Sequence, residues 1–170
     1  MTRRDYIIKW LAYTLALLPI LVLNLFLLPW FPIFGTIPSL LPVAAVTVAV
    51  MEGPMAGAGF GLFVGVLSDA FIPGVPGAMT LGLALLGLIA GAAARYRVRQ
   101  NLLGCLVCSA GTLILIDLIR VVFSLLRGEA PLSALLAVAL PEIFWSLVFT
   151  PLIYAIFLWV CRRVPRASIL

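Results

Sequence analysis

The chain has 170 residues, of which 65% are hydrophobic and only 10% are charged, which excludes an ordinary soluble domain. Its eleven Lys and Arg outnumber six Asp and Glu, but nine of these cations lie in short clusters that cap apolar segments. A nucleic-acid-binding surface needs a continuous basic face, so nucleic acid is excluded as a partner. We therefore expect one all-α membrane domain, residues 1–170, with lipid as the solvent for most of its surface.

Six apolar segments, separated by proline, glycine or charge, each predict a membrane-spanning helix. The first is long enough to span and lacks a cleavage site, which argues against a secretory signal. The second is short and contains Pro38 and Pro42, so a re-entrant pair is the alternative to a tilted crossing. The turn at Glu52-Gly53-Pro54 predicts a tight hairpin of the second and third helices. The predicted helices cover residues 10–28, 36–51, 55–72, 78–94, 102–126 and 140–160.

The basic clusters predict the orientation of these helices, because cytoplasmic flanks carry the Lys and Arg. Six crossings with a cytoplasmic N-terminus bring all three clusters and the C-terminus to the cytoplasmic side. Attraction to anionic lipid headgroups accounts for the same cations without an acidic protein partner. The clusters are Arg3, Arg4 and Lys9; Arg95, Arg97 and Arg99; and Arg162, Arg163 and Arg166.

A row of glycines at four-residue spacing runs along the third segment. Such a row forms a groove that lets another helix approach closely, so we expect this helix to be a contact helix. Packing within the chain is favoured over packing against a partner, because rows of small residues are common inside helical bundles. The fourth segment carries a shorter version of the pattern. The predicted packing glycines are Gly53, Gly57, Gly61 and Gly65, followed by Gly87 and Gly91.

Four ionisable residues lie within apolar segments: Asp69, Asp117, Arg120 and Glu142. An unpaired charge in the bilayer centre costs at least ~2.5 kcal/mol, so these groups are candidates for pairing or for function. The topology puts all four in the outer half of the membrane, where we expect a polar cluster that holds the third, fifth and sixth helices together. A proton or substrate site is the alternative, and Glu142 after Pro141 suggests a helix start.

No catalytic, cofactor or metal site is predicted. Cys105 and Cys108 are interpreted as small packing residues, because the chain has no histidine to complete a metal site. The chain also lacks a G-x-S-x-G, P-loop or H-E-x-x-H motif. An enzyme is therefore not expected.

Residues 52–69, E-G-P-M-A-G-A-G-F-G-L-F-V-G-V-L-S-D, are followed by a Pro/Gly loop, Gly77, Leu81 and L-G-L-I-A-G. This stretch resembles the MreD family of bacterial rod-shape-determining membrane proteins. Pro38-Ser39-Leu40-Leu41 is similar to the P-D-L-L at the start of that family's second helix, with Ser39 in place of the acid. The resemblance covers about sixty residues. It implies that the scaffold determinants of this chain are Gly57, Gly61, Gly65 and Asp69.

The resemblance implies a non-enzymatic subunit of the cell-elongation machinery in the bacterial cytoplasmic membrane. Its implied partners are MreC above all, with MreB, RodA and the elongation transpeptidase in the same complex. It also implies a six-helix fold like that of the substrate-binding S components of energy-coupling-factor transporters. A vitamin-binding S component is the alternative function, since Ala12 and Ala16 form an A-x-x-x-A on the first helix. A small proton-coupled transporter using Asp117 and Glu142 is the third.

Overall fold

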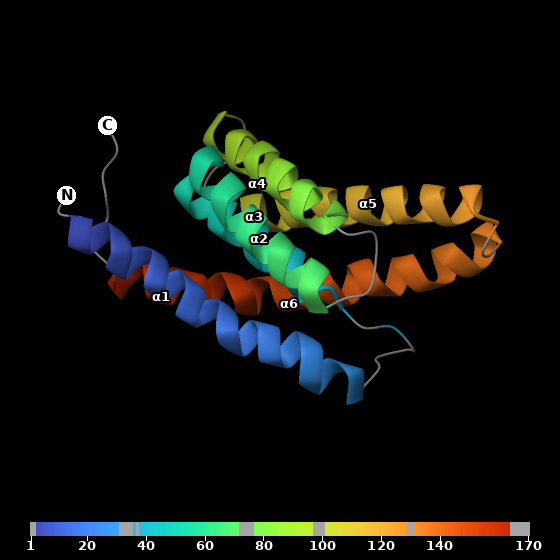
Figure 1. Cartoon of the computed structure of the whole chain (residues 1–170), viewed down its shortest axis with the longest axis horizontal. Helices are drawn as coiled ribbons and strands as arrows, with labels where there is room; N and C mark the ends of the chain where they lie inside the picture. Colours follow the sequence, from blue (N-terminus) through green and yellow to red (C-terminus); the bar gives the residue numbers. More distant parts are fainter. Residues whose placement is uncertain are drawn as a thin grey trace.

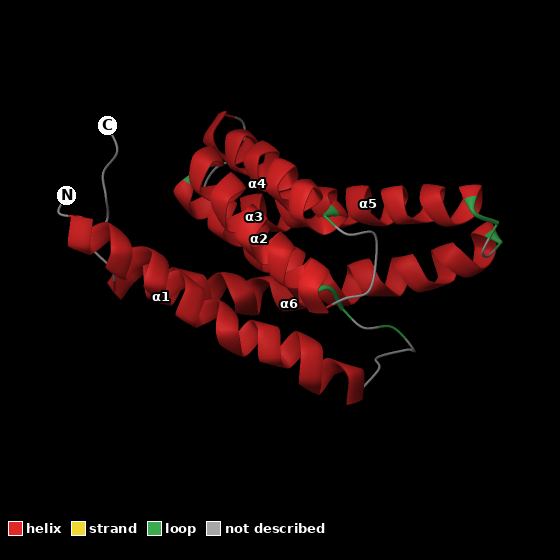
Figure 2. Ribbon diagram, viewed as in Figure 1, coloured by secondary structure: helices red, strands yellow, loops and turns green. Residues whose placement is uncertain are grey.

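The computed structural model describes residues 3–30, 36, 38–71, 77–96, 101–128 and 131–163. Nearly all of these residues are helical (Figure 2), and five of the helices are long and apolar enough to cross a membrane. A π-helical turn, Leu23–Leu27, and a 3-10 turn, Leu28–Trp30, extend the first helix. The helices are α1 (Arg3–Val22), α2 (Leu40–Glu52), α3 (Pro54–Phe71), α4 (Ala78–Tyr96), α5 (Leu102–Leu126) and α6 (Leu132–Arg163).

The helix boundaries differ from the predicted ones mainly in α2 and α6. Helix α2 begins at Leu40 rather than at residue 36. Helix α6 begins at Leu132 rather than at residue 140, and Pro141 lies inside it. The expectation that Glu142 opens a helix is therefore wrong. In lipid, an interior proline is tolerated where nearby side chains and neighbouring helices satisfy the freed backbone groups, so Pro141 does not mark a boundary.

Helix α2 is the centre of the molecule. Every residue from Leu40 to Val50 is buried, and α2 contacts each of the other five helices. Its thirteen residues extend about 20 Å at 1.5 Å per residue, which is less than the ~30 Å hydrocarbon core. Its length alone therefore does not make it a membrane span, and it is instead enclosed by the longer helices (Figure 1).

Helices α3 and α4 pack against each other along their backbones, and this is the most extensive contact between two helices. A Cβ atom at Gly57 would lie 2.6 Å from the carbonyl oxygen of Gly87, and one at Gly91 would lie 2.7 Å from Cα of Pro54. Gly61 and Gly65 face the α4 backbone in the same way, at Leu83 and at Thr80. The glycine row is therefore used within the chain.

Gly53 differs from the other glycines of the predicted row. It lies between α2 and α3 with a φ of 99°, and a Cβ atom there would meet nothing within 4 Å. A glycine is required here because the tight turn has a left-handed backbone, which residues with a Cβ rarely adopt. Gly53 thus closes the α2–α3 hairpin, whereas the groove itself begins at Gly57.

The beginning of α1 and the ends of α4 and α6 lie at the same end of the molecule (Figure 1). Arg95 and Arg162, the exposed cations of the last turns of α4 and α6, are therefore at this end, together with Lys9. Arg97, Arg99 and Arg166 lie outside the described residues, and the same applies to the side chains of Arg3, Arg4 and Arg163.

The packing of α3 on α4 generates a first prediction, which compares two glycines of the same helix. Gly61→Ala should destabilise the protein by about 1–3 kcal/mol, because the new methyl group would overlap the α4 backbone. Gly59→Ala introduces the same group into open space, and should be neutral or stabilise the helix by up to about 1 kcal/mol. Unfolding of both variants in detergent measures the difference. Equal stabilities would contradict the backbone contact.

Candidate functional site

Polar side chains from α1 and α6 meet the start of α2. The N–H of Leu40 donates a hydrogen bond to Oδ1 of Asn24 (3.1 Å), and the N–H of Ser39 donates to Oγ of Ser146 (2.9 Å). The first N–H groups of a helix have no partner within the helix and must find one elsewhere when water is excluded. Asn24 and Ser146 therefore cap a helix end that is enclosed by protein.

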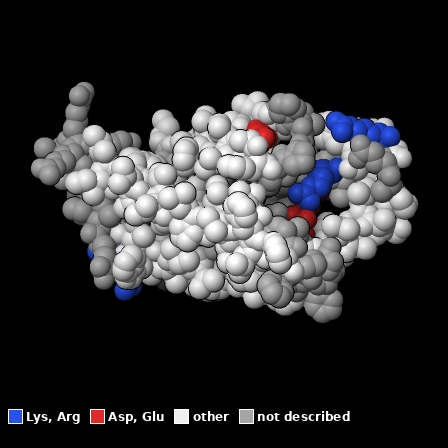
Figure 3. All heavy atoms as spheres, turned by 60° about the horizontal axis from the view of Figure 1, so that its bottom comes forward, with Lys and Arg blue, Asp and Glu red and all other residues white. Residues whose placement is uncertain are grey.

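Glu142 on α6 is the hub of the polar groups next to this helix end. It is 6% exposed, and Oε1 accepts a hydrogen bond from the hydroxyl of Ser39. Its other oxygen accepts a hydrogen bond from Nη1 of Arg120 at 2.9 Å, while Asp117 lies 3.5 Å from the same nitrogen. The Ser39–Glu142–Arg120–Asp117 group thus connects the start of α2 with α5 and α6. Figure 3 shows adjacent charged atoms in a hollow of a face that otherwise carries few charges.

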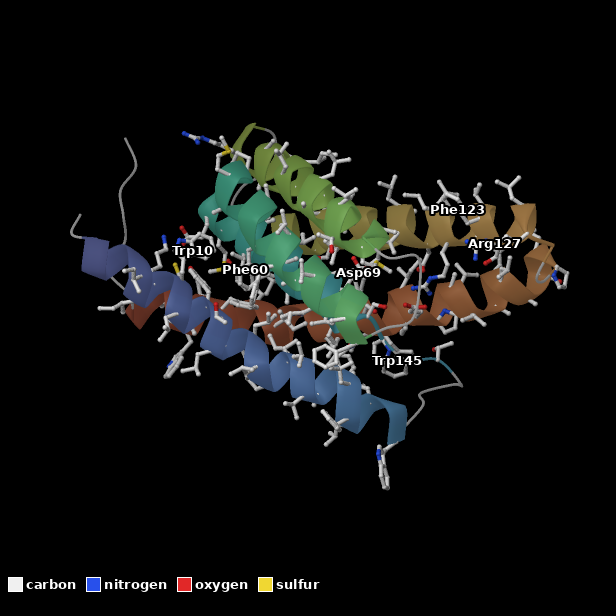
Figure 4. All side chains as sticks on the ribbon, in the orientation of Figure 1. Trp10, Phe60, Asp69, Phe123, Arg127 and Trp145 are labelled. Carbon is white, nitrogen blue, oxygen red and sulfur yellow. The ribbon has the colours of Figure 1, made fainter. Side chains whose placement is uncertain are left out.

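Asp69 does not belong to this group. Its carboxylate accepts hydrogen bonds from the N–H groups of Met79 (3.3 Å) and Thr80 (3.0 Å) and from the hydroxyl of Thr80 (2.6 Å). Asp69 near the end of α3 therefore caps the start of α4 (Figure 4). The predicted set divides in two: Asp69 joins α3 to α4, and the other three residues join α5 to α6 and to the start of α2.

A third polar group lies at the opposite end of α2. Glu52 accepts a hydrogen bond from the ammonium group of Lys9 and another from the hydroxyl of Tyr13 at 2.6 Å. Lys9 and Glu52 are 12% and 15% exposed, so the predicted headgroup cation is a largely buried ion-pair partner. The ring of Tyr13 also packs against Phe60 and Phe157, at centroid distances of 6.4 and 6.0 Å. These contacts hold α1 on α2, α3 and α6.

Sequence reasoning missed four residues of these groups: Tyr13, Asn24, Thr80 and Ser146. Asn24 offered a signal, because it is an isolated amide in a long apolar segment, where an unsatisfied polar group is costly. The π-helical turn at Leu23–Leu27 contains Asn24. Tyr13 and Ser146 offered no comparable signal, since both residue types are common in membrane helices.

The arrangement provides no evident reaction chemistry among the residues that the structure describes. Their His, Cys, Asp and Glu form no group of three that could hold a metal ion. Cys105 is fully buried with its Sγ 3.4 Å from the hydroxyl of Thr47, and Cys108 lies on the same helix beside the Ala90 carbonyl. The polar side chains instead hold helices to one another, because each of the three carboxylates Glu52, Asp69 and Glu142 receives donors from another helix or helix start.

The cap on α4 generates a second prediction. Asp69→Ala removes the acceptor for the N–H groups of Met79 and Thr80, so their amide hydrogen exchange should rise several-fold. Exchange measured by mass spectrometry or by NMR in detergent tests this. Amides in the middle of α4 are the internal control and should change much less. Unchanged exchange at the two capped amides would contradict the assignment.

The division of the polar residues generates a third prediction, which a pair of double-mutant cycles can test. Arg120→Met and Glu142→Leu should be coupled by about 0.5–3 kcal/mol, because the two side chains are hydrogen-bonded. Asp69→Ala combined with Glu142→Leu is the matched control, and the two effects should add. Coupling between Asp69 and Glu142 as large as that between Arg120 and Glu142 would mean that one cluster includes all of them.

Comparisons with known proteins do not extend these observations. The chain matches no protein-family model, no curated protein and no solved structure. The residues and their contacts are therefore the basis for proposing a function.

Proposed function

We propose that the protein is a non-enzymatic scaffold subunit of the bacterial cell-elongation machinery, in the cytoplasmic membrane, with six crossings and both termini in the cytoplasm. The proposal rests on the contacts made by residues 52–91, the segment that resembles MreD. Its glycines form the backbone contact of α3 with α4, and its two carboxylates, Glu52 and Asp69, join helices at opposite ends of α3.

The contacts of the carried-over residues support a scaffold more than a ligand-binding or transport function. Gly57, Gly61 and Gly65 are buried against other helices, and the carboxylate of Asp69 is hydrogen-bonded to the start of α4. Helices that are packed backbone to backbone form a rigid unit, because sliding or separating them would break many close contacts at once. A rigid unit of this kind suits a protein that positions others.

The outward faces of the helices remain free to bind partner membrane proteins. On α3 and α4, Leu62, Val66, Leu81 and Leu85 are 49%, 50%, 74% and 61% exposed. Since lipid tails are as apolar as leucine, shape and close packing decide whether such a face binds a helix or lipid. The family resemblance names MreC as the first partner, with MreB, RodA and the elongation transpeptidase in the same assembly.

Depletion of the protein from a rod-shaped host tests the proposed function, and should make the cells round. Expression of Gly59→Ala during depletion should restore the rod shape, whereas Gly61→Leu should not, because only the second substitution disturbs the α3–α4 contact. A photocrosslinking residue at position 62, 81 or 85 should capture MreC in the rescued cells.

Normal cell shape after complete depletion would contradict the proposal. A defect in vitamin uptake with normal shape would favour a substrate-binding S component instead. Loss of the rod shape without crosslinking to MreC at any lipid-facing position of the bundle would support a role in the cell-elongation machinery. It would exclude MreC as the direct partner.

A further inference from the structure

The guanidinium of Arg120 has hydrogen-bond donors that the polar group of α5 and α6 does not use. Its Nη1 atom contacts both neighbouring carboxylates, at 2.9 Å from Glu142 and 3.5 Å from Asp117. A guanidinium also carries N–H groups on Nε and on its second terminal nitrogen, Nη2. No described residue accepts a hydrogen bond from these groups, and the side chain is 46% exposed. Arg120 can therefore bind an acceptor that comes from outside the protein.

The carboxylate of Asp117 is incomplete in the opposite sense, because it lacks a donor. Its side chain is 7% exposed, and its contact with Nη1 of Arg120 is longer than an ordinary hydrogen bond. Glu142 differs, since its two oxygens accept hydrogen bonds from Ser39 and Arg120. Among the described residues, every fully enclosed side-chain oxygen has a hydrogen bond, so the carboxylate of Asp117 still reaches the surface at its edge. A donor from outside the protein can satisfy it there.

The surface around these two residues faces lipid. Ile119 and Phe123 on α5 are 50% and 57% exposed, and Val138, one turn before Glu142 on α6, is 50% exposed. Large apolar side chains that are this exposed on a membrane-spanning helix contact lipid tails. Figure 3 shows adjacent positive and negative atoms in a hollow of a face with few other charges. Membrane lipids therefore have direct access to the two incomplete groups.

The depth of Arg120 matches that of lipid phosphates. Helix α5 follows Arg95, the exposed cation in the last turn of α4, so its start is near one membrane surface. From Leu102 to Arg120 the helix extends about 27 Å at 1.5 Å per residue, close to the ~30 Å hydrocarbon core. A long side chain at this depth extends to the headgroups of the opposite surface.

We infer that Arg120 and Asp117 form a binding site for a phospholipid whose headgroup carries a primary ammonium group, such as phosphatidylethanolamine. The phosphate oxygens accept hydrogen bonds from Nε and Nη2 of Arg120, whose planar fork suits a phosphate. The ammonium group donates to the carboxylate of Asp117. The two residues are one turn apart on the same face of α5, and ethanolamine holds its phosphate and ammonium groups comparably close together.

The same two residues determine which headgroups fit. Phosphatidylglycerol satisfies Arg120, but it has no cation for Asp117 and brings a second negative charge close to that carboxylate. Phosphatidylcholine has a positive charge but no N–H group to donate, so the carboxylate stays without a hydrogen bond. The site therefore favours the primary ammonium over both alternatives.

Native mass spectrometry of the full chain, purified in detergent and mixed with one lipid at a time, tests this site. The probes are phosphatidylethanolamine, phosphatidylglycerol and phosphatidylcholine with identical acyl chains. The protein should retain one phosphatidylethanolamine with an affinity about tenfold higher than for either other lipid, a difference that one charge-assisted hydrogen bond supplies.

Two conservative substitutions separate the contributions of phosphate and ammonium. Arg120→Lys keeps the positive charge beside Glu142 but loses the fork, so the affinity for phosphatidylethanolamine should fall about tenfold. Asp117→Asn removes the charge that binds the ammonium group, so the affinities for the three lipids should become equal. Arg162→Lys is the matched control, because it makes the same change at an exposed arginine in the last turn of α6, and its lipid affinities should not change.

Three outcomes would overturn the inference. The first is equal affinity of the unsubstituted protein for the three lipids, a result that does not depend on the folding of any variant. The second is an affinity for phosphatidylethanolamine that Arg120→Lys leaves unchanged or that Arg162→Lys reduces equally. The third is displacement of the lipid by an equal concentration of glycerophosphoethanolamine, which would assign the site to a soluble zwitterion instead of a lipid.

Discussion

The need to satisfy the backbone at the start of α2 organises much of the molecule. A helix of this length ends within the protein rather than in water, so the N–H groups of Ser39 and Leu40 require acceptors from neighbouring helices. Asn24 and Ser146 supply them, one from the extension of α1 and one from α6. The hydroxyl of Ser39 then binds Glu142, which in turn binds Arg120. One buried helix end thereby fixes the relative positions of α1, α2, α5 and α6.

The hairpin of α3 and α4 is held by a different kind of contact. Apolar side chains gain little by leaving lipid for protein, so close packing has to supply the stabilisation that the hydrophobic effect supplies in water. Glycines remove the side chains between the two backbones, and Asp69 adds three hydrogen bonds to the start of α4. This combination accounts for the four-residue spacing that the glycines share with Asp69: together they specify a packed pair of helices.

Much of this arrangement could be predicted from the sequence, because hydropathy reveals helices and a four-residue glycine spacing reveals a helix groove. The bounds of α5 are those predicted, and α3 and α4 begin within one residue of the predicted starts. Prediction failed where tertiary contacts decide the outcome. Pro141 suggests a helix start in the sequence, but α6 continues through it. The expected topology places Asp69 and Glu142 in the same half of the membrane, but depth alone does not tell which residues face each other. Gly53 fits the spacing of the row and yet belongs to a turn.

The central position of α2 has a consequence for biosynthesis. A segment too short to partition into lipid by itself has to enter the membrane together with a neighbour, and the tight turn at Gly53 makes α3 that neighbour. Ser146 and Glu142 are synthesised last among the groups that hold the start of α2. Until α6 has been synthesised, the N–H of Ser39 lacks its acceptor, so the start of α2 becomes completely hydrogen-bonded only when translation is nearly finished.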